Sequence, residues 1–178
     1  MSKILIHCAL LSEAQTFINF LKLKQNNSVQ NLPDGVKIFE DINGEYLLVV
    51  SGIGRDKTVK ALDFIYKKFT IKKALNIGIV GCSDFSVKIG TLFCTNKFLY
   101  QVNYGSLTTV DTPLESDENL ETLLVDMEAK YFLELSKGNC DDLYVFKIVS
   151  DYLDAQIPNK SFIISLIQNV YPKIKKYL

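Results

Sequence analysis

The sequence is poor in the residues that metal centres and triad hydrolases require. Its only histidine, His7, falls in a short apolar run that is typical of a buried strand. One histidine in a strand provides no His–His or His–Cys set for zinc. A Ser-His-Asp triad would have to use this same histidine, because the sequence contains no other. We therefore expect no metal site, and any chemistry has to rest on carboxylates.

The cysteines are also placed unfavourably for redox or metal chemistry. Cys8, Cys82, Cys94 and Cys140 are far apart in the chain, form no C-x-x-C pair, and three of them lie in apolar, strand-like surroundings. We predict that they are buried free thiols.

Neither sign of charge is in excess, because lysine plus arginine and aspartate plus glutamate both total 20. Such a chain has no net field to attract DNA, RNA or an anionic membrane, so neither is an expected partner. The apolar run at the N-terminus soon meets Glu13, which predicts neither a signal peptide nor a membrane span. We expect a cytoplasmic protein.

Two common phosphate-binding motifs are missing. No G-x-x-x-x-G-K-[ST] sequence is present, which excludes P-loop chemistry. Gly52-Ile-Gly54 begins like a dinucleotide fingerprint, but Lys57 stands where the third glycine is needed and a predicted hairpin precedes it. We interpret these glycines as a tight turn whose backbone N–H groups are open to a ligand.

The pattern of apolar residues indicates an α/β protein. With 178 residues, 48% of them hydrophobic and 22% charged, the chain suits one compact domain over 1–178. Strands are expected at about 3–10, 36–41, 45–51, 74–80, 90–98, 107–110, 123–126 and 143–150, and helices at about 12–23, 56–69, from 129 and from 160. Because strands and helices alternate after an Asn43-Gly44 hairpin, we predict a mixed, mainly parallel sheet covered on both faces.

Two finer predictions concern helix ends. Ser12 and Gln15 have the spacing of a capping box, with Ser12 as the N-cap and Gln15 reaching back. Pro172, inside the last helical pattern, is expected to kink or restart that helix.

Acidic residues follow three predicted strands. Asp126-Met127-Glu128 stands where a strand passes into a helix, Glu13 follows the first strand, and Ser150-Asp151 ends the last one. Each alone is explained as an acid at a helix terminus or a turn. Carboxyl ends of parallel strands share one edge of a sheet, however, where α/β proteins bind their ligands, so together they favour a functional site.

The order of these motifs resembles the purine nucleoside and uridine phosphorylase superfamily, and within it the 5′-methylthioadenosine/S-adenosylhomocysteine nucleosidases. Five stretches carry the resemblance, namely 4–14, 49–54, 76–81, 125–129 and 146–151. The resemblance implies a nucleoside phosphorylase-like α/β/α fold and hydrolysis of a purine N-glycosidic bond, with neither a metal nor an organic cofactor.

The resemblance also implies roles for individual residues. Glu13 would position and activate water against the anomeric carbon. Met127 and Glu128 would hold the ribose, with Glu128 accepting hydrogen bonds from its hydroxyls. Asp151 would protonate the purine N7, and Ser150 would support it.

Further substrate-binding positions follow from the same resemblance. Gly81 belongs to the glycine-rich loop after the central strand, and Leu114 to a segment like the one that supplies the base pocket. Lys147 stands where these nucleosidases commonly have an arginine near the water. A homodimer, in which a neighbour helps to close the site, is also implied.

The chain departs from the family pattern at Ile79, where serine or threonine is common, and at Pro113, where an aromatic residue often stacks on the base. The stretch 101–119 is also shorter than usual. Two alternatives stay open for these reasons: a nucleoside-binding homologue without catalysis, and a phosphorylase. The second is disfavoured because only Arg55 is available in the first half to grip phosphate.

Overall fold

Four apolar strands form the centre of the sheet in the computed structural model, which describes residues 2–114, 118, 120–154 and 156–178. They are β1 (Lys3–Cys8), β4 (Tyr46–Val50), β5 (Ile71–Cys82) and β10 (Asp142–Asp151), in the spatial order β4-β1-β5-β10 and all parallel. Their nearly continuous apolar runs follow from burial on both faces. All four carboxyl ends therefore point to the same edge.

Shorter strands extend this centre on both sides. On the β4 side are β3 (Lys37–Glu40) and β2 (Lys24–Gln25), and on the β10 side are β6 (Leu92–Cys94) and β7 (Asn103–Tyr104). The end of β5 also pairs with β9 (Leu124–Asp126), which pairs with β8 (Leu107–Thr109). Among the residues that the structure describes, the result is a mixed sheet of ten strands.

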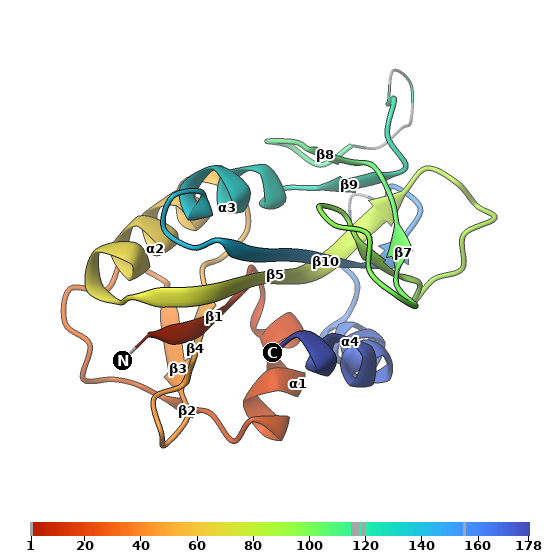
Figure 1. Ribbon diagram of the computed structural model, residues 1–178. Coiled ribbons are helices and arrows are strands. Elements are labelled where there is room, and N and C mark those ends of the chain that lie inside the picture. Colours follow the sequence, from red (N-terminus) through yellow and green to blue (C-terminus); the bar gives the residue numbers. More distant parts are fainter. Residues whose placement is uncertain (1, 115–117, 119, 155) are drawn as a thin grey trace.

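Helices cover the two faces of the sheet (Figure 1). One face packs against α1 (Leu11–Phe20) and α4 (Lys160–Ile174), and the other against α2 (Arg55–Lys68) and α3 (Ala129–Ser136). The predicted α/β class with a mainly parallel, two-sided sheet is confirmed. None of these helices is long and apolar enough to cross a membrane, within the part of the chain that the structure describes.

Several local predictions are also confirmed. β3 and β4 form the expected antiparallel hairpin, and Gly44 takes a φ of 69° in its turn. All four cysteines are buried and free. The only histidine lies in β1.

The predicted capping box of α1 is wrong by two residues. The N-cap is Leu10, not Ser12, and it is Glu13 whose carboxylate reaches back to the Leu10 N–H, at 2.8 Å. The Gln15 amide instead donates to Asn19 one turn further along. Glu13 outcompetes Gln15 because it occupies the third helical position, the one that faces the N-cap.

The strand predicted at 90–98 is shorter than expected and the helix around Pro172 is longer. Ladder pairing ends after Cys94 because the Asn96 amide takes over, donating to Leu143 O and accepting from Val145 N–H. α4 does not restart at Pro172 but runs to Ile174 before a 3-10 turn, η1 (Lys175–Tyr177). So close to the end of a helix, a missing N–H removes only one bond.

Candidate active site

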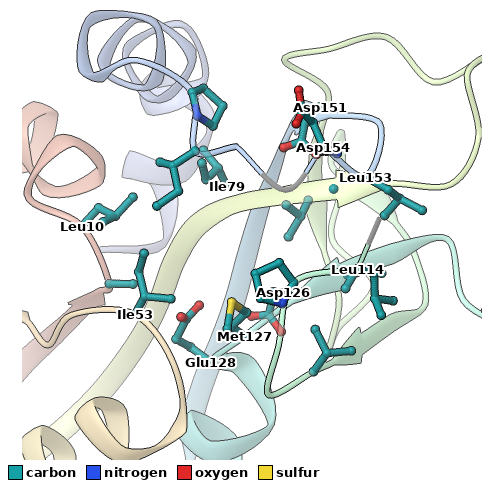
Figure 2. A pocket seen from close by; sticks show the side chains of 18 of the residues that line it. Leu10, Ile53, Ile79, Leu114, Asp126, Met127, Glu128, Asp151, Leu153 and Asp154 are labelled. Atoms are coloured by element: carbon teal, nitrogen blue, oxygen red, sulfur yellow. Dashed lines mark hydrogen bonds between the residues drawn. The ribbon is translucent and has the colours of Figure 1, made fainter. Parts of the chain in front are cut away.

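A cleft of about 140 Å³ opens at the carboxyl edge of the sheet. Its walls come from the end of β1, the turn before α2, the end of β5, the β9–α3 junction and the segment after β10. Six of the predicted site residues line it: Glu13, Gly81, Leu114, Met127, Glu128 and Asp151. Figure 2 shows Met127 and Glu128 between Leu10 and Ile53 on one side and Leu114 and Leu153 on the other.

Glu13 is fixed by the main chain on three sides. One carboxylate oxygen accepts from the N–H groups of Ala9 (3.0 Å) and Leu10 (2.8 Å), and the other accepts from the Ile79 N–H (2.9 Å). The residue is only 3% exposed. Burial raises its pKa, while these N–H groups and the Lys147 ammonium act in the opposite direction. The result is a rigid carboxylate with one edge in the cleft.

Glu128 is the N-cap residue of α3 and reaches across to the glycine turn. One of its carboxylate oxygens accepts the Gly54 N–H at 2.8 Å. Burial raises the pKa of Glu128 to about 7, against the pull of the Lys147 ammonium. The carboxylates of Asp126 and Glu13 add to the rise. Glu128 therefore changes charge near neutral pH.

Asp151, the last residue of β10, is held by its own segment. The Ser150 hydroxyl donates to one carboxylate oxygen at 2.6 Å, and the Asp154 N–H donates to the other at 3.1 Å. Gly81 lies directly beside it, since a Cβ on that glycine would stand 3.2 Å from the Asp151 Oδ1. A side chain at position 81 would therefore push against Asp151.

Lys147 and Ser150 lie behind the residues that line the cleft. Lys147, only 1% exposed, forms an ion pair of 2.6 Å with Asp126. Burial acts to lower the pKa of Lys147, but the carboxylates of Asp126, Glu128 and Glu13 outweigh it and the pKa lies above its ordinary value. One buried ammonium thus faces three carboxylates. Asp126 is further held by the Thr109 hydroxyl at 2.6 Å.

Sequence reasoning missed the segment that follows Asp151. Leu153, Asp154, Gln156 and Ile157 all line the cleft. This stretch has no helical or strand period, so nothing in the pattern marked it. Asn159, which caps α4 by accepting the Phe162 N–H, marks where this segment ends but not that it lines the cleft.

Comparison with known proteins identifies the architecture through structure and not through sequence. No family model and no curated protein sequence matches the chain. Among solved structures, the futalosine hydrolase of Helicobacter pylori strain 26695 superposes with a TM-score of 0.79 at 15% identity, over 99% of this chain and 97% of that one.

Nucleosidases superpose equally completely. The 5′-methylthioadenosine/S-adenosylhomocysteine nucleosidase of Helicobacter pylori, with butyl-thio-DADMe-Immucillin-A, gives a TM-score of 0.75 at 14% identity, over 99% of this chain and 97% of that one. A nucleosidase variant from Chlamydia trachomatis bound to MTA gives 0.76 at 16% identity, over all of both chains.

The chain has the nucleoside phosphorylase fold. The resemblance inferred from the five ordered motifs is thereby confirmed at the level of the fold. In this nucleoside phosphorylase fold the cleft lies at the carboxyl ends of β1, β5 and β10, the edge at which acidic residues were expected to meet.

Proposed function

We propose that this chain hydrolyses the N-glycosidic bond of a purine ribonucleoside such as 5′-methylthioadenosine or S-adenosylhomocysteine. The observation that carries the proposal is the meeting of three carboxylates, Glu13, Glu128 and Asp151, from three separate parts of the chain around one cleft. Apolar residues such as Leu10, Ile53 and Leu114 form much of the remaining wall, which suits a base and an apolar 5′ substituent.

In this proposal Glu13 orients the attacking water. Three backbone N–H bonds fix its carboxylate, so little reorganisation is needed when the water approaches the anomeric carbon. The carboxylate takes up the proton that the water loses, and the nearby Lys147 ammonium favours its ionised form beforehand.

Glu128 and Met127 hold the ribose. One carboxylate oxygen accepts the Gly54 N–H, and no described residue bonds to the other, which can accept from the ribose hydroxyls. This contact strengthens as positive charge develops on the sugar, so it belongs to the transition state more than to the ground state. Because Glu128 has a pKa of about 7, the contact is fully available only above neutral pH.

Asp151 delivers a proton to N7 of the purine, so that the base leaves as a neutral molecule. The Ser150 hydroxyl and the Asp154 N–H keep its carboxyl group in place at the mouth of the cleft. Gly81 leaves room for the base beside it. A single acid at the leaving group and a single base at the water are the minimum that such a hydrolysis needs.

A second candidate function is nucleoside binding without catalysis. The observation that favours it is the surroundings of Glu13, where Ile79 lends only a backbone N–H and Lys147 is engaged by Asp126. Phosphorolysis has less support, because none of the described residues that line the cleft is a lysine, an arginine or a histidine.

Incubation with 5′-methylthioadenosine separates these functions. The wild type should release adenine without phosphate, while Glu13→Gln and Asp151→Asn should each lose about 10²- to 10⁴-fold in rate, the usual contribution of a general acid or base. Release that both variants retain in full contradicts the roles given to these residues. Binding by calorimetry without release supports the binding protein, and strict phosphate dependence supports a phosphorylase.

The predicted homodimer is part of this proposal. Light scattering on the protein with and without a nucleoside measures it directly.

A further inference from the structure

His7 is completely buried in the middle of the sheet and does not line the cleft. Burial, helped by the Lys147 ammonium, lowers its pKa to about 3, so the imidazole is neutral at physiological pH. Its ring stacks on Phe132, with centroids 5.9 Å apart. A buried aromatic position would tolerate a phenylalanine, so the two ring nitrogens need an explanation of their own.

Each ring nitrogen of His7 has a defined role as donor or acceptor. Its Nδ1 accepts from the Asn76 side-chain amide at 2.8 Å, because that amide nitrogen can only donate. In a neutral ring the proton must then be on Nε2, which donates to the Ser51 hydroxyl oxygen at 2.9 Å. The Ser51 hydroxyl hydrogen is thereby left for the Gly52 carbonyl, at 2.8 Å.

The hydrogen bonds from Asn76 through His7 and Ser51 to Gly52 form a relay. The relay ends on the 52–54 glycine turn, whose Gly54 N–H donates to Glu128. Gly52 and Gly54 have φ angles of 89° and 91°, which other residues adopt only with strain, so the turn has few side chains of its own to fix it. Gly52 N–H donates to the Ala9 carbonyl, and Gly54 N–H donates to Glu128. Ala9 N–H in turn donates to Glu13.

We propose that His7 and Ser51 are positioning residues, which hold the 52–54 turn so that the Gly54 N–H meets Glu128. The imidazole fixes the Ser51 hydroxyl, the hydroxyl fixes the Gly52 peptide, and the turn presents its amide to the carboxylate. The importance of Glu128 for turnover rests on the proposed function, whereas the relay itself can be tested without any catalysis.

The titration of Glu128 measures the relay directly. With glutamate labelled at its carboxyl carbon, NMR follows the ionisation of each glutamate, and Glu128→Gln identifies the signal. Ser51→Ala removes the hydroxyl and should raise the pKa of Glu128 by about 0.5 pH unit or more, since a loosened Gly54 N–H stabilises the carboxylate less. The charged groups facing Glu128 (Lys147, Asp126 and Glu13) are unchanged in this variant.

Thr58→Val is the matched control. Thr58 is as buried as Ser51 and begins the next helical turn, and its N–H donates to the Gly54 carbonyl. Its hydroxyl, however, has no hydrogen-bond partner in the part of the chain described here. Removing this hydroxyl should leave the Glu128 titration at its wild-type position. Ser51→Thr, which keeps a hydroxyl, should also titrate like the wild type.

Hydrogen exchange of the Gly54 amide supplies a second readout. In Ser51→Ala this amide should exchange about tenfold faster than in the wild type, while amides in the centre of β5 keep their rates. If Ser51→Ala does not fold, His7→Phe keeps the stacking on Phe132 and removes both the Nε2 donor to Ser51 and the Nδ1 acceptor of the Asn76 amide, and a smaller shift in the same direction is expected.

A Glu128 titration and a Gly54 exchange rate that stay at wild-type values in Ser51→Ala overturn the inference, even if the variant is less stable. That result would leave His7 and Ser51 as packing residues only. Adenine release by the wild type alongside such a result would support the proposed function and still reject the relay. A shifted Glu128 titration in a protein that releases no adenine would support the relay and reject the proposed function.

Discussion

The two sides of the cleft are built differently. Glu13 and Glu128 are buried, and backbone N–H groups from distant parts of the chain hold them, together with a shared buried ammonium. Asp151 is partly exposed and is held only by its neighbours Ser150 and Asp154. In the proposed function, the water and the ribose thus meet a rigid, preorganised wall, while the base meets a locally built and more open one.

The largest effect should come from Lys147, the buried ammonium behind the side of the cleft that Glu13 and Glu128 form. Lys147→Met leaves Asp126, Glu13 and Glu128 without their ammonium, and removing one partner of a buried pair typically destabilises a protein by about 3–5 kcal/mol. Urea unfolding measures this change.

The control for this variant is Lys73→Met. Lys73 pairs with Asp142 at 3.6 Å in a half-exposed setting and donates to the Tyr177 carbonyl at 2.9 Å, so its loss should lower stability by only about 1–2 kcal/mol. Equal losses of unfolding free energy in the two variants would show that the buried and the half-exposed ion pair contribute equally to stability.

A smaller effect concerns pH. The pKa of Glu128 is raised in the folded protein to about 7 from 4.5, so the folded state binds its proton more tightly than the unfolded chain does. The contribution of Glu128 to the free energy of unfolding is therefore largest below pH 4.5. This contribution is lost as the pH rises towards 7, by an amount on the order of 2–3 kcal/mol.

Urea unfolding at pH 5 and pH 7.5 tests this dependence, with Glu128→Gln as the reference. The variant should lose much less stability over that interval than the wild type. Identical pH dependence in both proteins would show that Glu128 titrates normally and that its side of the cleft is wetter than the structure indicates.

The smallest effect on stability is expected beside Asp151, on the more exposed side of the cleft. Ser150→Ala removes the hydroxyl bonded to Asp151 and should lower stability by only about 1 kcal/mol, the usual net contribution of one hydrogen bond. If the proposed function holds, adenine release should fall more than stability does, because Asp151 loses its orientation. A loss as large as that of Lys147→Met would show that the two walls are equally rigid.

The meeting of the acids was predictable because it depends only on topology. Parallel strands bring their carboxyl ends to one edge, so Glu13 after β1 and Asp151 at the end of β10 had to lie near each other once these strands were recognised. Glu128 was expected at a strand-to-helix junction and does begin α3, but β9, the strand before it, runs antiparallel to β5, so the argument from parallel strands does not by itself place it in the cleft.

The partners of these acids could not be predicted in the same way. Glu13 accepts from Ile79 and Glu128 from Gly54, contacts between residues 66 and 74 positions apart in the chain that no local pattern encodes. Lys147, within an apolar strand, gave no sign that it would be buried against Asp126. The irregular segment around Asp154 has no period at all, so its place in the cleft became visible only in the structure.

Hydrolysis in water enriched in oxygen-18 tests the central claim most directly. If Glu13 directs a water molecule at the anomeric carbon of 5′-methylthioadenosine, mass spectrometry should find one heavy oxygen in the released sugar and none in adenine. Glu13→Gln should reduce the labelled sugar by about 10²-fold or more. An unlabelled or phosphorylated sugar, or no sugar at all from the wild type, would contradict the account.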